Sequence, residues 1–506
     1  MSYAKRFLRG AGLGLTEHLL RTASLFVTTP LMVKWLGNVS YGYWLTAMSV
    51  LSYFNLLDLG MSFGTTRFMA QAVGARDSQR QAVIYRVATT HFRRTSMIIG
   101  MGSALAFILL PLLVSQGQEL SMQTLMLATI PAGLSMALRF LWRVPQLLLR
   151  AWVRHDLIAL AAIIRVAFQS TVLMLLLPQG GGIVLVGILH AFSDVLELTL
   201  QNRFSKRLPP FHHEVIEENE SAAGVRKELS SFTRDVVVGS IGDGVRAGVG
   251  PQVTGFVIGL NMVPVYAMGT RLITMAEDVV NSLFGGALLS IFGQLHGGAE
   301  TERLKREFSR IITITAGFGA AAVGGLILFG KAFLRRWLGE KFDGAYAVMV
   351  VLSVPYGLYF MQYPSLSLLF TLGYQKYMMW LRCASGLFAG ICAISFGLVW
   401  GFMGVAWGPA VEMFILYAVA FPLLVHKATG IPWQRYAWNL LLWPAMKGLA
   451  LPLLAGWIMK PWITEDYTRI IVCSAIYALS MIVSVPLFLL DPEGRQSLKE
   501  LLARKR

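Results

Sequence analysis

Four arginines of this sequence lie inside long apolar stretches, and three of them have an acidic residue nearby in the same stretch. The arginines are Arg21, Arg165, Arg246 and Arg271, and the acidic neighbours are Glu17, Asp243 and Asp278. Each acid lies three, four or seven residues from its arginine, and these spacings place both side chains on or near one face of a helix. A charge inside a bilayer costs at least about 2.5–3.5 kcal/mol, so these residues are expected to face a watery cavity or a partner.

The guanidinium group is planar, permanently charged and able to contact two phosphate oxygens at once. We therefore predict a cationic cavity that binds an anionic, phosphate-bearing group. Its predicted binding residues are Arg21, Arg246, Arg271 and Arg165. The alternative is that the arginines only hold helices together through the neighbouring acids, and the sequence leaves both interpretations open.

The carboxylates suit a second task, which is coupling to an ion. A carboxylate near an arginine can exchange a proton or a cation for an ion pair as a cavity opens and closes. Glu17, Asp243 and Asp278 are therefore candidate coupling groups. Asp58, with Arg67 beyond it, is interpreted as a gate or a salt bridge at the cytoplasmic face, in preference to a substrate contact.

A further polar stripe consists of His190, Asp194, Glu197 and Gln201. Spacings of four, three and four residues keep these side chains on one helical face. Three interpretations remain open: a proton relay, a hydrophilic cavity wall, or a hydrogen-bonded seam between helices. His190 alone is weak support for a metal site, and no metal or cofactor is predicted.

The elements that must position these residues are transmembrane helices. Hydrophobic residues make up 55% of the 506 positions and charged residues 14%, against roughly 25% charged in soluble domains. Apolar blocks of about 20 residues recur, the length that crosses about 30 Å of hydrocarbon. Unpaired backbone is costly in lipid, so the predicted fold is all-α, with about fourteen helices. Bends are expected at Pro30, Pro251, Pro355, Pro364, Pro409 and Pro444.

The basic residues support a membrane orientation over a nucleic-acid interface. The net charge is +17, but lysines and arginines lie in short segments between the apolar blocks and form no aromatic-studded patch. Their concentration in alternate segments predicts two cytoplasmic termini and an even number of helices. The outer loop 331–344 is an exception with four basic residues, either an orientation anomaly or a surface that attracts an anionic substrate.

The polar segment 202–235 divides the chain almost in half. On either side of it, residues 74–89 align with 298–313, with Gly, Ala, Arg and Thr kept in place. This indicates two pseudo-repeated six-helix lobes. The predicted organisation is an N-terminal lobe at 1–201, a cytoplasmic linker at 202–235, a C-terminal lobe at 236–426, and two further helices with a cytoplasmic tail at 427–506.

The segment PLMVKWLGNVSYGYWLTAMSVLSYFNLLDLGMSFGTTRFMAQAVG (30–74) resembles the start of the Wzx-type O-antigen and polysaccharide flippases. These belong to the multidrug, oligosaccharidyl-lipid and polysaccharide (MOP) exporter superfamily. The features that carry the resemblance are Leu36-Gly37, Tyr41-Gly42, Leu57 to Gly60, and Arg67. Elsewhere the chain is similar in organisation, and WLGEKFDGAYAVMVVLS (337–353) resembles the outer loop that enters the tenth helix.

The resemblance implies two lobes around a central cavity, alternating access, and an undecaprenyl-diphosphate oligosaccharide as substrate. It implies a bacterial inner-membrane location and, as partners, membrane lipid and other polysaccharide-assembly proteins. A multidrug or other lipid-precursor exporter is the alternative, although buried arginines favour an anionic substrate. A membrane polymerase or ligase is less favoured because the longest predicted outer loop, about fourteen residues, is short for holding an acceptor; the chain is therefore expected not to be an enzyme.

Overall fold

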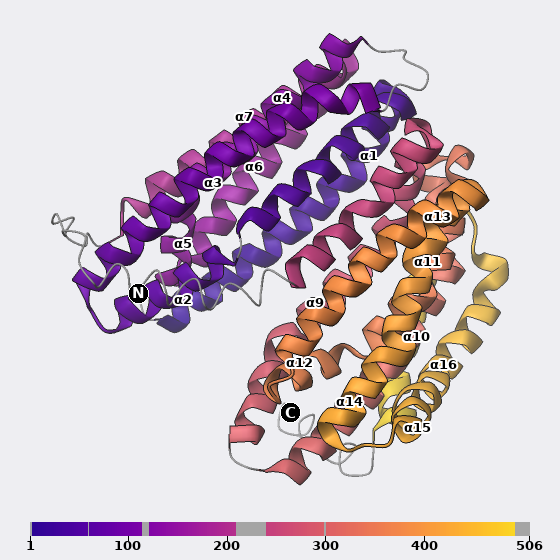
Figure 1. Ribbon diagram of the computed structural model, residues 1–506. Coiled ribbons are helices and arrows are strands. Elements are labelled where there is room, and N and C mark those ends of the chain that lie inside the picture. Colours follow the sequence, from indigo (N-terminus) through magenta and orange to yellow (C-terminus); the bar gives the residue numbers. More distant parts are fainter. Residues whose placement is uncertain (1–2, 59, 114–120, 209–238, 298–299, 491–506) are drawn as a thin grey trace. The chain divides into compact units, whose positions relative to one another are not determined.

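The apolar blocks form helices throughout the part of the chain that the computed structural model describes, residues 3–58, 60–113, 121–208, 239–297 and 300–490 (Figure 1). No strand occurs within these ranges. Nine of the described helices are long and apolar enough to cross a membrane. The all-α polytopic fold is thus confirmed, whereas the total of fourteen helices stays a prediction.

The chain forms two compact units, Met1–Pro264 and Val265–Arg506, and each is described by itself. The helices of the first unit are α1 (Tyr3–Phe54), η1 (Asn55–Asp58), α2 (Met61–Gly74), α3 (Ser78–Leu113), α4 (Met122–Leu141), α5 (Arg143–Ala151), α6 (His155–Leu176), η2 (Leu177–Gln179), α7 (Gly182–Ser205), a helix at 239–253, η3 (Thr254–Ile258) and η4 (Leu260–Met262). Phe92, Phe107 and Phe140 of α3 and α4 are almost fully buried in its core.

The second unit is built around α10. Its helices are α9 (Val263–Gly297), α10 (Thr301–Leu338), η5 (Glu340–Phe342), α11 (Asp343–Met361), α12 (Tyr363–Thr371), α13 (Gln375–Ile415), η6 (Leu416–Ala420), α14 (Phe421–Thr429), α15 (Trp433–Arg435), η7 (Tyr436–Leu442), α16 (Trp443–Met459), η8 (Lys460–Trp462), α17 (Tyr467–Ser484) and η9 (Val485–Leu489). Gly317 of α10 and Gly448 of α16 let the two helices pack closely, since a Cβ added to Gly448 would lie 2.4 Å from Gly317 Cα.

Glycine separates successive spans in two of the longest helices. A continuous 52-residue helix such as α1 would measure about 78 Å, more than twice the hydrocarbon thickness. Helical geometry is interrupted at Gly37, with φ 75°, and in α13 at Gly401, with φ 64°. Both values lie where glycine carries no steric penalty. Four of the prolines at predicted bends lie inside helices, namely Pro30, Pro251, Pro355 and Pro409, whereas Pro364 and Pro444 occupy the first turns of α12 and α16.

Two three-helix segments match in detail and support the predicted duplication. One residue, Trp142, separates α4 from the nine-residue helix α5. In the same way Gln362 separates α11 from the nine-residue helix α12. A left-handed residue follows in both, Val153 with φ 54° and Gly373 with φ 81°, before the long helix α6 or α13 begins. Positive φ is a genuine outlier for a β-branched residue. Val153 thus makes with strain a turn that Gly373 makes without it.

The first unit extends beyond the predicted linker. Tyr53 Oη on α1 donates a hydrogen bond of 2.9 Å to Gln252 Oε1, and a Cβ added to Gly42 would lie 1.9 Å from the Leu260 carbonyl oxygen. These contacts attach residues 239–264 to α1. Of the predicted linker, 202–235, only residues 202–208 are among the described residues. Part of the second repeat segment, 298–313, also lies outside them. The four-part division of the chain therefore stays a prediction.

Candidate functional site: a charged network in the first unit

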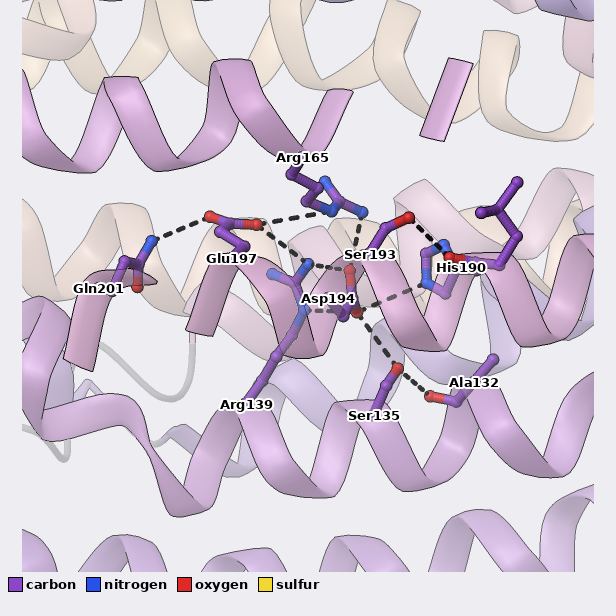
Figure 2. A network of polar contacts seen from close by, with 10 residues as sticks. Ala132, Ser135, Arg139, Arg165, His190, Ser193, Asp194, Glu197 and Gln201 are labelled. Carbon is purple, nitrogen blue, oxygen red and sulfur yellow. Dashed lines mark hydrogen bonds and ion pairs between the residues drawn. The ribbon is translucent and has the colours of Figure 1, made fainter. Parts of the chain in front are cut away.

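A network of charged side chains joins α4, α6 and α7 within the apolar first unit (Figure 2). Its centre is Asp194 of α7, whose side chain is only 2% exposed. Arg139 reaches it from α4 and Arg165 from α6. Each arginine thus comes from a different neighbour of α7, and one carboxylate links three helices.

The contacts to Asp194 have the geometry of a strong ion pair. Arg139 Nε donates to Asp194 Oδ2 at 2.7 Å, and Arg139 Nη2 donates to Oδ1 at 2.5 Å. Arg165 Nη2 lies 2.9 Å from Asp194 Oδ1, and Ser135 Oγ donates to Oδ2 at 3.2 Å. The two-pronged Arg139 contact matches the arginine fork to the carboxylate plane. A carboxylate this buried is tolerated because every contact here is a donor or a cation.

Glu197 completes the charge balance. Its Oε2 lies 3.6 Å from Arg139 Nη2 and 3.5 Å from Arg165 Nε, while Gln201 Nε2 donates to its Oε1 at 2.9 Å. Two arginines therefore face two carboxylates. His190 adds a nitrogen 3.7 Å from Asp194 Oδ2, and its ring meets Trp44 of α1 edge-on at 5.5 Å between centroids.

This geometry is that of a hydrogen-bonded seam between helices, one of the three interpretations of the stripe. The spacing of His190, Asp194, Glu197 and Gln201 correctly placed them on one side of α7 (Figure 2). Sequence reasoning missed Arg139, which lies in the last turn of α4, at the edge of its apolar block. Among the described residues, no group of three or more His, Cys, Asp or Glu side chains is arranged to hold a metal ion.

The other predicted binding arginines have different surroundings. Arg21 Nε lies 3.7 Å from Glu17 Oε1, and the Arg21 side chain is 54% exposed. Arg246 Nη1 lies 3.7 Å from Asp243 Oδ1, and the Arg246 side chain is mostly buried. Both pairs therefore share a helical face as the spacing predicts. In the second unit, Arg271 of α9 is half-buried and Asp278 is exposed.

Asp58 is linked to an arginine through a serine. Ser62 Oγ donates to Asp58 Oδ1 at 2.7 Å, and Arg143 Nε of α5 donates to Ser62 Oγ at 3.0 Å. Burial lowers the pKa of Arg143, and the negative charge of Asp58 opposes that change. Arg67, the residue noted beside Asp58 in the sequence, has its guanidinium over the Phe68 ring. Asp58 thus connects η1 and α2 to α5 through Ser62, and its role as a gate stays a prediction.

The second unit has an aromatic cluster formed by side chains of α11, α12, η6 and α14. Tyr359 of α11 lies 5.2 Å from Tyr417 and 6.1 Å from Tyr363 between ring centroids, and Tyr417 lies 5.0 Å from Phe421. The four-residue spacings of Tyr359 and Tyr363, and of Tyr417 and Phe421, are visible in the sequence and could have predicted that each pair lies on one helical face.

Long apolar helices, glycine breaks between spans, and a buried charged network define a polytopic helical membrane protein. The chain is similar to the lipid II flippase MurJ in an inward closed conformation, with a TM-score of 0.70, 13% identity, and coverage of 94% of this chain and 98% of that one. It is similar to an inward-facing multidrug resistance MATE family transporter of the MOP superfamily, with a TM-score of 0.66, 16% identity, and coverage of 81% and 98%.

A third similar structure is a MOP superfamily transporter from Pyrococcus furiosus with a reversed polarity of its binding pocket, with a TM-score of 0.51, 16% identity, and coverage of 85% and 97%. No protein-family model and no curated protein matches the sequence. At these identities the likeness shows the fold alone, which is the fold that these MOP superfamily transporters share.

Proposed function

We propose that this chain is a MOP superfamily flippase that carries an undecaprenyl-diphosphate-linked oligosaccharide across the bacterial cytoplasmic membrane by alternating access through a cationic cavity. The observation that carries the proposal is the extent of the likeness to a lipid-precursor flippase. The MurJ structure covers 94% of this chain, whereas the multidrug transporter covers 81%. A helix arrangement shared with a lipid II flippase over nearly the whole chain favours a lipid-linked cargo.

The arginines support an anionic cargo. Arg165 is held by Asp194 and Glu197, so its proposed contribution is secondary. Arg21 retains an exposed guanidinium beside Glu17, and Arg246 and Arg271 complete the proposed set. Guanidinium groups suit the oxygens of a diphosphate.

The aromatic cluster of the second unit supports a glycan on that cargo. Tyr356, Tyr359 and Tyr363 are half-buried and combine an apolar ring face with a hydroxyl. A sugar has the same two requirements, because its ring carbons are apolar and its hydroxyls need partners. Because tyrosine side chains can meet both requirements, we propose that the oligosaccharide contacts this aromatic cluster of the second unit.

Ion coupling is proposed for Glu17, Asp243 and Asp278, with Asp58 as a gating residue. Glu17 and Asp243 lie 3.7 Å from Arg21 and Arg246 in helices that must move if access alternates. Proton or cation uptake by either carboxylate would weaken its ion pair. Transport that responds to neither a proton nor a sodium gradient across the vesicle would remove this part of the proposal.

The experiment that tests the function is reconstitution of the full chain in proteoliposomes with an undecaprenyl-diphosphate oligosaccharide in the inner leaflet. A membrane-impermeant glycosidase outside the vesicle reports each glycan that crosses. We expect the wild type to expose glycan, and Arg246→Gln combined with Arg271→Gln to reduce the rate at least about ten-fold. Arg303→Gln, at an exposed site outside the set, is the matched control. A thermal melt of each variant separates lost transport from lost folding.

A multidrug exporter is the second candidate, favoured by the MATE likeness and by the charge-balanced seam, in which Arg165 adds no net positive charge. The same vesicles loaded with a cationic dye distinguish the two. Dye efflux without glycan exposure would replace the flippase proposal.

A further inference from the structure

A cationic pocket lies within the second unit, where α10, η7, α16 and η9 meet. Its volume is about 420 Å³, within the roughly 300–1,000 Å³ typical of small-molecule sites. Arg306 and Arg310 line it from α10, and Lys447 lines it from α16. None of these three residues belongs to the proposed transport site.

Basic side chains dominate the described lining of the pocket. These lining residues include three cations and no carboxylate, and Glu307 beside them has its Oε1 3.6 Å from Arg310 Nη1. The hydroxyls of Ser309 and Thr313 donate to carbonyl oxygens of their own helix. The strongest hydrogen-bond donors that line the pocket are therefore the charged side chains, an arrangement suited to an anion.

The pocket also lies at the boundary between polar and apolar parts of the helices. After Arg310, α10 has no charged residue until Lys331. Trp433, Trp438 and Trp443 are exposed along α15, η7 and α16, and tryptophan concentrates at membrane–water interfaces. Lys447 Nζ lies 5.0 Å from the Trp443 ring centroid. These features place the pocket at headgroup depth.

One side of the pocket is apolar. Leu440, Phe488 and Leu489 contribute to its lining, and Phe488 is exposed on the surface. A free phosphate ion would make no use of this wall, whereas a lipid has chains to place on it. Basic pockets between transmembrane helices at the membrane surface are a general means of holding anionic lipid headgroups.

We propose that this pocket binds the headgroup of an anionic phospholipid, with the phosphodiester between Arg306, Arg310 and Lys447 and the acyl chains against Phe488 and Leu489. The proposal is independent of the transported cargo, because it concerns a resident lipid. A zwitterionic lipid would bring a cation into the same positive field and is disfavoured.

The test measures lipid retained by the purified full chain in mixed nanodiscs of phosphatidylglycerol and phosphatidylcholine, by native mass spectrometry. The wild type is expected to retain phosphatidylglycerol preferentially. Arg306→Gln combined with Lys447→Gln is expected to weaken that binding at least about ten-fold, since each basic residue near a membrane surface adds to the attraction of anionic lipid. Arg306→Lys, which keeps the charge, is expected to retain most of the binding.

The matched control removes the same charge from the same helix outside the pocket. Arg303 and Lys305 pair with Glu300 and Glu302 on the exposed start of α10, and the double variant Arg303→Gln, Lys305→Gln is expected to bind phosphatidylglycerol as the wild type does. Equal losses in the two double variants would overturn the proposal. So would equal retention of the two lipids by the wild type, or glycerol 3-phosphate binding as tightly as phosphatidylglycerol. Melting temperatures show that each variant is folded.

Discussion

Arg165 Nη2 lies 2.9 Å from Asp194 Oδ1, so a guanidinium of α6 shares one buried carboxylate of α7 with Arg139 of α4. The shared carboxylate makes Asp194 the residue on which both cations depend. Glu197 lies farther from both, at 3.5–3.6 Å. Asp194 makes the shorter contacts, so it is the main link among the three helices and Glu197 is the weaker one.

Asp194→Asn is expected to destabilise the protein strongly. The substitution keeps the side-chain shape but leaves Arg139 and Arg165 with Glu197 alone, and breaking a buried ion pair costs about 3–5 kcal/mol. Thermal unfolding of the protein in detergent measures the loss. Glu302→Gln, whose carboxylate is 84% exposed in its pair with Lys305, is the control and should change stability by less than about 1 kcal/mol. Equal melting temperatures for the two variants would contradict the role of Asp194.

Removing one cation together with Asp194 should recover part of that loss. In Arg165→Gln, Asp194→Asn, one arginine and one carboxylate remain, Arg139 and Glu197, whose nearest atoms lie 3.6 Å apart. The double variant is expected to be more stable than Asp194→Asn alone, because residues in one network are energetically coupled. A double-mutant cycle on the melting data checks this, and additive losses would show that the two side chains do not interact.

Close packing of α10 against α16 yields a prediction for the second unit. Gly448→Ala places a methyl group 2.4 Å from Gly317 Cα, a distance that forces the helices apart. We expect a loss of stability of about 1–3 kcal/mol, the usual cost of overpacking. Gly293→Ala on α9, where an added Cβ meets no atom within 4 Å, should preserve or raise the melting temperature.

A buried hydrogen-bond network in the second unit has its own test. Tyr436 Oη lies 2.7 Å from Ser365 Oγ and donates to Gln362 Oε1 at 3.2 Å, while the Tyr436 ring stacks on Phe308. Tyr436→Phe keeps the ring and should cost about 1–3 kcal/mol, because buried polar groups lose a partner. Tyr467→Phe, at an exposed site, should be nearly neutral. Similar losses in both variants would count against the network.

The helical plan could be predicted from sequence because it depends on local composition. Apolar blocks of spanning length, glycine at the breaks and the periodic stripe on α7 are each visible in short windows of sequence. The partners of the buried charges were not visible in this way. Arg139 meets Asp194 across 55 positions and Arg143 reaches Asp58 through Ser62, and such pairings depend on how helices pack. The aromatic cluster has the same origin, since Tyr359 and Tyr417 come from different helices.

The contrast between Arg165 and Arg21 separates a structural cation from a proposed substrate contact. Arg165 contacts two carboxylates, so Arg165→Gln should lower the melting temperature and reduce transport together. Arg21 is 54% exposed and 3.7 Å from Glu17, and an exposed pair contributes about 0–1 kcal/mol. Arg21→Gln should therefore leave the melting temperature nearly unchanged while slowing glycan exposure in the vesicle assay about ten-fold. Arg21→Lys should retain part of the rate, because it keeps the charge and loses the bidentate geometry. An Arg21→Gln variant that transports at the wild-type rate would exclude Arg21 from the binding set and leave Arg246 and Arg271 as the cations to test.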